Sequence, residues 1–170
     1  MKTCILLALI ASLPIAVRSA EPASEQRLDE VEQRGAQVMP FSLGQTTHYF
    51  TKTATGGVQQ VLVKDAADTP QIQLIREHLR KIAGEFQRGD FADPTQIHGD
   101  AMPGLADLKK AGPVQLRVDY KELPEGAEID YATDDPRLVH ALHQWFDAQL
   151  SDHARHAMPS HSQHSQHQMQ

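Results

Sequence analysis

The chain has 170 residues, with 22 acidic and 16 basic side chains, and therefore a formal net charge of −6 at pH 7. A negative surface repels phosphate backbones and anionic lipid headgroups, so this balance argues against nucleic acid as a partner. The single cysteine, Cys4, lies near the N-terminus, so neither disulfides nor thiolate ligands are expected in the body of the protein.

Residues 1–20 have the layout of a secretory signal peptide. Lys2 precedes an apolar stretch from Cys4 to Val17, and small residues surround Ser19. The apolar stretch is shorter than the ~20 residues that a membrane-spanning helix needs. We therefore expect an exported, periplasmic protein with no integral membrane segment after cleavage. The alternative is an uncleaved N-terminal anchor.

Residues 21–40 are charged and only weakly periodic, which predicts a surface arm or a short helix. A single domain is expected over residues 41–156. It opens with a β-hairpin, because β-branched and aromatic residues flank the Thr-Gly-Gly turn at 55–57. An amphipathic helix follows, because apolar residues recur in steps of three and four from Ile72 to Phe86.

The second half of the domain repeats the order of hairpin and helix. A loop at 95–102 leads into a short helix at 103–111, and apolar residues then alternate over 114–120 and 127–131. Asp135 and the proline after it begin a final helix. These elements predict an α+β fold: a small antiparallel sheet from two β-hairpins, each followed by a helix, with the helices packed on one face.

Histidine and methionine carry the clearest chemical signal in the domain. His98 and Met102 share the irregular segment IHGDAMPG, and an imidazole beside a thioether suits copper, whose reduced form prefers soft sulfur. His153 and His156 are three residues apart at the end of the final helix, where they project over the body and are spaced to chelate one ion. The further candidate ligands in the body are His143 and His48.

Each of these side chains also has an ordinary structural interpretation. Met102 fills a gap in the core, His98 lies on a loop, and a frayed helix end turns His153 and His156 toward water. His78 follows Glu77 on its helix and is predicted to lie on the surface.

Residues 157–170 form a tail rich in His, Met and Gln, which we expect to be disordered without a ligand. Histidines recur there every third residue, and imidazoles on a flexible chain bind copper or zinc in a labile way. The tail ligands are His161, His164, His167 and Met158. Alternatively, the tail is a solubilising extension that gains charge below about pH 6.5.

Four segments carry a resemblance: TTHYF, GGVQQVLVKD, HLRKIAGEFQRGDFADPTQIHGDAMPGL and YATDDPRLVHALHQWFDAQLSDHARHA. In these segments, the chain resembles a family of small exported bacterial proteins. The activity of this family is not established, and some relatives carry the label aspartate carbamoyltransferase. Such enzymes are two-domain proteins with a Ser-x-Arg-Thr-Arg phosphate-binding motif, which this chain lacks. The resemblance therefore implies an exported single domain and no catalytic residue.

The sequence leads to three hypotheses. The first is an exported metal-binding protein, with copper favoured over zinc, for tolerance, storage or delivery. The second is a metal-free module that binds another envelope protein or a small ligand. The third is a small hydrolase or transferase, for which neither a G-x-S-x-G nucleophile, a phosphate loop nor an H-E-x-x-H motif is present.

Overall fold

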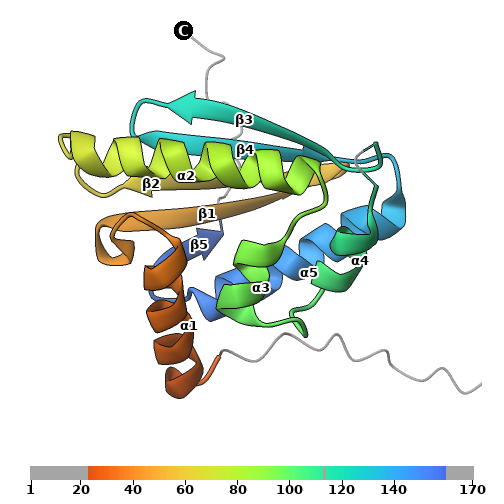
Figure 1. The fold of residues 1–170 in the computed structure, drawn as a ribbon, viewed down its shortest axis with the longest axis horizontal. Helices are drawn as coiled ribbons and strands as arrows, with labels where there is room; N and C mark the ends of the chain where they lie inside the picture. The colour runs from red at the N-terminus through yellow and green to blue at the C-terminus, as the bar shows by residue number, and fades with distance from the viewer. Residues whose placement is uncertain (1–22, 113, 160–170) are drawn as a thin grey trace, which may run out of the picture.

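The computed structural model describes residues 23–112 and 114–159. The predicted signal peptide and the tail histidines His161, His164 and His167 lie outside these residues. The predicted α+β fold is confirmed: two β-hairpins, each followed by a helix, build one sheet with helices packed against it (Figure 1). Within the described residues, no helix combines the length and the hydropathy needed to cross a membrane.

The two hairpins lie side by side in the sheet. β1 (Thr46–Thr53) pairs with β2 (Gly56–Val63), and β3 (Arg117–Leu123) pairs with β4 (Gly126–Ala132), all antiparallel. β2 also pairs antiparallel with β4, which gives the strand order β3-β4-β2-β1-β5. Alternate residues of β1 and β2 are buried, so each strand turns one side toward the core.

A short fifth strand extends the sheet beyond β1. β5 (Ala157–Pro159) pairs with β1 in parallel, which makes the sheet mixed. The sequence placed residues 157–159 in the tail, and this boundary was wrong. The strand is added through backbone hydrogen bonds, such as His48 N donating to the His156 carbonyl at 2.8 Å, and these require no apolar side chains.

Two long helices cover the buried face of the sheet. α2 (Thr69–Gln87) packs over β3 and β4, and α5 (Pro136–Asp152) packs over β1 and β2. Tyr131 of β4 lies between them, with ring centroids 6.3 Å from Phe86 of α2 and 5.9 Å from Trp145 of α5. Both helices therefore lie on one face, as predicted.

Three shorter helices close the end of the core. The charged segment near the N-terminus forms α1 (Glu25–Val38), which Ser24 caps by accepting from Arg27 N and which buries Leu28 and Val31. α3 (Ala92–His98) occupies part of the predicted loop, and α4 (Leu105–Lys110) is the predicted short helix. A 3-10 turn at Leu43–Gln45 leads into β1.

A buried histidine cluster as the candidate functional site

Three histidines from distant parts of the chain meet in the core. The ring centroids of His48 and His153 are 5.4 Å apart, and those of His98 and His153 are 5.0 Å apart. All three residues are buried, with 3% of His48 and 6% each of His98 and His153 exposed. We call these three residues the histidine cluster. The structure therefore brings together three of the residues that the sequence singled out.

Each histidine owes its position to a local feature of its element. His48 occupies an inward position of β1, between the inward residues Thr46 and Phe50. His98 is the last residue of α3, and Gly99 follows in the left-handed region at φ 85°, where the chain turns away. His153 is the C-cap residue of α5, and its ring stacks against that of His48.

Burial keeps the imidazoles of His48 and His153 neutral at pH 7. Burial, reinforced by the neighbouring His78 and His156, lowers the pKa of His48 from 6.5 to about 4. Burial also lowers the pKa of His153 well below 6.5, with smaller contributions from the imidazoles of His48 and His98. A neutral imidazole has a free lone pair on one ring nitrogen, and this is the form that binds metals.

His98 is oriented by a carboxylate and an arginine. Its Nδ1 lies 2.7 Å from Asp152 Oδ2, and Arg27 of α1 contacts the same oxygen at 2.5 Å. Burial opposes ionisation of Asp152, but hydrogen bonds from His98 and Arg27 outweigh it and lower the pKa of Asp152 from 3.8 to about 2. Because Asp152 is ionised at pH 7, Nδ1 of a neutral His98 carries the proton and Nε2 keeps its lone pair.

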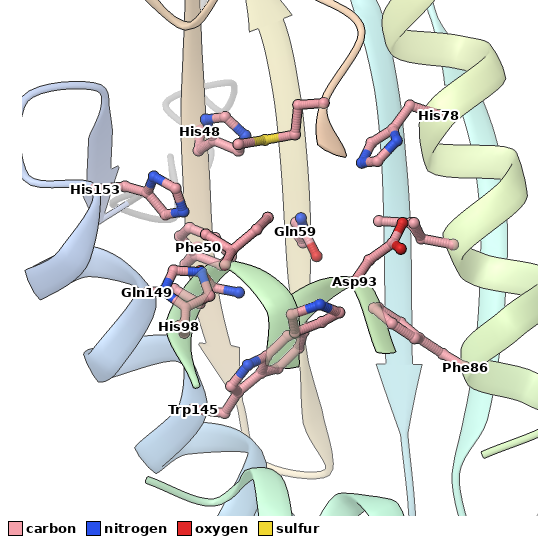
Figure 2. A pocket seen from close by; sticks show the side chains of 14 residues that line it. His48, Phe50, Gln59, His78, Phe86, Asp93, His98, Trp145, Gln149 and His153 are labelled. Carbon is pink, nitrogen blue, oxygen red and sulfur yellow. The ribbon is translucent and has the colours of Figure 1, made fainter. Parts of the chain in front are cut away.

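The histidine cluster lines a cavity of about 40 Å³ between the sheet, α2, α3 and α5 (Figure 2). Its three rings lie on one side of the cavity, and His78 of α2 lies on the other side, with Gln59 between them. Several further side chains with nitrogen, oxygen or sulfur atoms, none of which was predicted as part of a site, complete the lining. They are His78, Met39, Gln59, Asp93, Gln149 and Trp145.

His78 was predicted to lie on the surface, and this was wrong. The residue is 8% exposed, and its ring packs edge-on against Phe41 at a centroid distance of 5.6 Å. His78 lies three residues after Ile75 and four before Ile82, so the helical period places it on the buried side of α2. This spacing in the sequence could have predicted that His78 is buried.

Two polar atoms of the cavity lining have no hydrogen-bond partner within the described part of the chain. They are His48 Nδ1 and Trp145 Nε1. A buried polar atom without a partner costs about 1–3 kcal/mol. A cavity of about 40 Å³ has room for a water molecule or an ion, which would satisfy such atoms. The cavity therefore has the space and the free ring nitrogen of a ligand site.

The other predicted ligands lie elsewhere. Met102 is buried but lines a separate groove, with Arg27 and Asp152. Nε2 of His143 lies 2.8 Å from the Gly56 carbonyl oxygen and 3.1 Å from that of Thr53, at the β1–β2 turn.

Nε2 of His156 lies 3.8 Å from Glu32 Oε1 of α1. Met158 is on β5 and is 52% exposed. The four predicted ligands Met102, His143, His156 and Met158 are thus outside the cavity.

The ring nitrogens of the histidine cluster do not yet surround a common point. Across residues 23–112 and 114–159, no group of three or more His, Cys, Asp or Glu side chains has the arrangement of a metal site. The rings must turn about their side-chain torsions before their nitrogen atoms can bind one ion.

No protein-family model, curated protein or solved structure matches the chain.

Proposed function

We propose that this protein binds a transition-metal ion through His48, His98 and His153, with copper preferred over zinc. The observation that carries the proposal is the meeting of three buried imidazoles at centroid distances of 5.0 and 5.4 Å. Two imidazoles that bind one tetrahedral ion at about 2.0–2.1 Å have ring centroids about 5 Å apart. The spacings of His153 to His48 and of His153 to His98 are therefore those of two ligands to one ion, and the rings must turn to share it.

The pairing of His98 with Asp152 adds independent support. Histidine ligands commonly donate the proton of the non-binding ring nitrogen to a carboxylate, which fixes the ring and makes the binding nitrogen more basic. The 2.7 Å contact between His98 Nδ1 and Asp152 Oδ2 has this form, and Arg27 holds the carboxylate in place. This arrangement leaves Nε2 of His98 as the ligand atom.

The preference for copper rests on the donors around the cavity. Met39 lines it together with all three rings of the histidine cluster, and a thioether is a soft donor that favours reduced copper. The described residues contain no thiolate, which zinc sites use frequently. Imidazole nitrogen with thioether sulfur is therefore a donor set suited to copper.

An exported protein that holds copper would act in tolerance, storage or delivery of the ion. The signal-peptide pattern at residues 1–20 and the histidines of the tail fit this role, because the tail would capture ions loosely before the core holds them. A metal-free binding module and a hydrolase or transferase remain the competing hypotheses, and the experiment below separates them from the first.

The test is a competition titration of the purified full-length protein with Cu⁺ under reducing conditions, against a chelator of known affinity. The starting protein carries Cys4→Ser, His161→Gln, His164→Gln and His167→Gln, so that neither the thiol nor the tail imidazoles bind Cu⁺. In this background, we expect His48→Gln and His153→Gln each to weaken binding by about a hundredfold, since each removes a ligand.

The matched control is His140→Gln, because His140 is exposed on α5 and does not line the cavity. This control is expected to bind as the starting protein does. Circular dichroism in the near ultraviolet, where buried Trp145 contributes, verifies that each variant keeps its packing. If both cavity variants bind copper as tightly as the control, the metal site in the core is refuted.

A further inference from the structure

We infer that the sheet binds an amphipathic α-helix of a partner protein on the face that is turned away from the protein's own helices. We call this side of the sheet the open face, and it consists of the outward-facing side chains of the five strands. The inference goes beyond the proposed function, because it concerns a different surface and does not depend on a metal ion.

The described helices pack on one side of the sheet (Figure 1). α2 and α5 cover the buried face, α1 packs against α3 and α5, and α4 packs against α5. The inward-facing residues of β2 are buried, whereas Val58, Gln60 and Leu62, which alternate with them, are only half-buried. Within residues 23–112 and 114–159, the side chains of the open face are therefore accessible to a partner.

The open face carries an apolar patch, formed by Tyr49, Val58, Leu62 and Met158. Tyr49 of β1 pairs with Met158 of β5 on one side and with Gln60 of β2 on the other. Val58 and Leu62 flank Gln60 along β2, so both are diagonal neighbours of Tyr49, at about 7–8 Å. Met158 is 52% exposed. Tyrosine and methionine are enriched at protein interfaces, so the apolar patch has the composition of a binding surface.

Asp130 lies beside the apolar patch and is opposite Val58 on β2 and Asp119 on β3. Arg117 donates to Asp119 at 2.9 Å, and Asp130 forms no ion pair within the described part of the chain. Burial raises the pKa of Asp130, and the carboxylates of Glu128 and Asp119 raise it further against the opposing effect of Arg117. A lysine or arginine of a partner would offset this repulsion, so the open face favours a cationic partner.

A helix matches the size and the chemistry of the open face. The backbone groups of the central strands are already paired with one another, so the face offers side chains but no hydrogen bonds for an added strand. A helix satisfies its own backbone and is about 10 Å wide, which covers two or three strands spaced about 4.8 Å apart. Residues i and i+4 of a helix are about 6 Å apart, so an apolar and a cationic side chain reach the apolar patch and Asp130 together.

A second copy of the chain fits this face less well than one helix does. The open face is five strands wide and at most eight residues long, or about 20 Å by 25 Å, which gives an area of about 500 Å². A stable dimer buries about 800 Å² on each partner. Each copy also has a net charge of −6 and would place Asp130 in the contact, so the two copies would repel each other.

The test is the fluorescence anisotropy of a labelled amphipathic peptide that is titrated with the natural full-length protein in the presence of EDTA. The peptide forms about four helical turns, with leucines along one side and lysines beside them. Micromolar binding is expected. A peptide of the same composition in scrambled order, which has no apolar side as a helix, should bind about tenfold more weakly. An amphipathic peptide that binds no better than the scrambled one would overturn the inference.

Leu62→Gln and Asp130→Asn are each expected to weaken peptide binding about tenfold, because one removes an apolar contact and the other removes the unpaired charge. The matched controls are Val139→Gln, half-buried on α5, and Asp107→Asn, exposed on α4, and both should bind as the natural protein does. Circular dichroism verifies that all four variants fold. The same affinity in the variants and their controls would overturn the inference, and a loss in Leu62→Gln alone would overturn the ion pair with Asp130.

The same samples distinguish two other occupants of the open face. If sedimentation shows a dimer of the natural protein and a monomer of Leu62→Gln, a second copy is the occupant and the inference is wrong. If the backbone amide resonances of residues 160–170 shift in Leu62→Gln, the chain's own C-terminal residues are the occupant, with the same consequence. The Cu⁺ affinity of Leu62→Gln should equal that of the natural protein, so the inference and the proposed function can fail independently.

Discussion

The free energy of unfolding should depend on pH through His78, which lines the cavity. Burial, partly offset by the nearby Asp93, lowers the pKa of His78 from 6.5 to about 4. Because the folded protein binds this proton more weakly than the unfolded chain, the contribution of His78 to stability is complete above about pH 6.5. It is lost as the pH falls toward 4.

The magnitude follows from the two pKa values. A difference of about 2.5 pH units corresponds to about 3 kcal/mol across the whole window, of which about 2 kcal/mol is lost between pH 7.5 and pH 5. The His78→Gln variant has no proton to gain there. We therefore expect its free energy of unfolding to fall by about 2 kcal/mol less than that of the natural protein over the same interval.

Urea unfolding at pH 7.5 and pH 5, followed by the fluorescence of Trp145, measures both values, because Trp145 is the single tryptophan and is buried. The control is His140→Gln, which removes an exposed histidine and should keep the natural pH dependence. If His78→Gln loses as much stability in acid as the control, His78 is not the buried neutral imidazole described above.

Three further outcomes are expected. Asp152→Asn should lower the free energy of unfolding by about 2 kcal/mol at pH 7 and by less as the pH falls below 4, because Asp152 stabilises the fold only while its carboxylate is ionised. Urea titrations at pH 7 and at a pH below 4 check this, and an equal loss at the two would contradict it. Gly104→Ala should cost several kcal/mol in the same assay, since its Cβ would lie 1.9 Å from the Ala141 carbonyl oxygen, and a natural midpoint would contradict the fit. Met39→Leu should weaken Cu⁺ binding in the competition titration while leaving Zn²⁺ affinity unchanged, and an equal loss for both ions would exclude a thioether ligand.

Local pattern was sufficient for the order of the two hairpins and the two long helices. The β-branched and aromatic residues before the Thr-Gly-Gly turn placed His48 on a strand, and the helical period of the final helix predicted that His153 projects over the body of the protein. The alternation of apolar residues predicted the start of β3 incorrectly. Val114 was predicted to begin an inward-facing strand, yet β3 begins at Arg117 and Val114 is 96% exposed.

The composition of the site depended on tertiary contacts that spacing does not encode. Met39 follows a charged helix and has no periodic partner in the sequence, and it reaches the cavity only because α1 packs against the body. Asp152 and His98 are 54 residues apart, so nothing local predicted their hydrogen bond. Met102 was grouped with His98 because they are close in sequence, but α3 ends between them and directs Met102 into the groove.

The central claim, that imidazoles of the core bind copper, is tested most directly by X-ray absorption at the copper edge. The sample is the Cu⁺ complex of the full-length protein with Cys4 and the three tail histidines replaced. We predict a first shell of imidazole nitrogens at about 2.0 Å with one sulfur. This shell should lose a nitrogen in His48→Gln or His153→Gln and remain complete in His140→Gln. A first shell that is identical in all four proteins would contradict the claim.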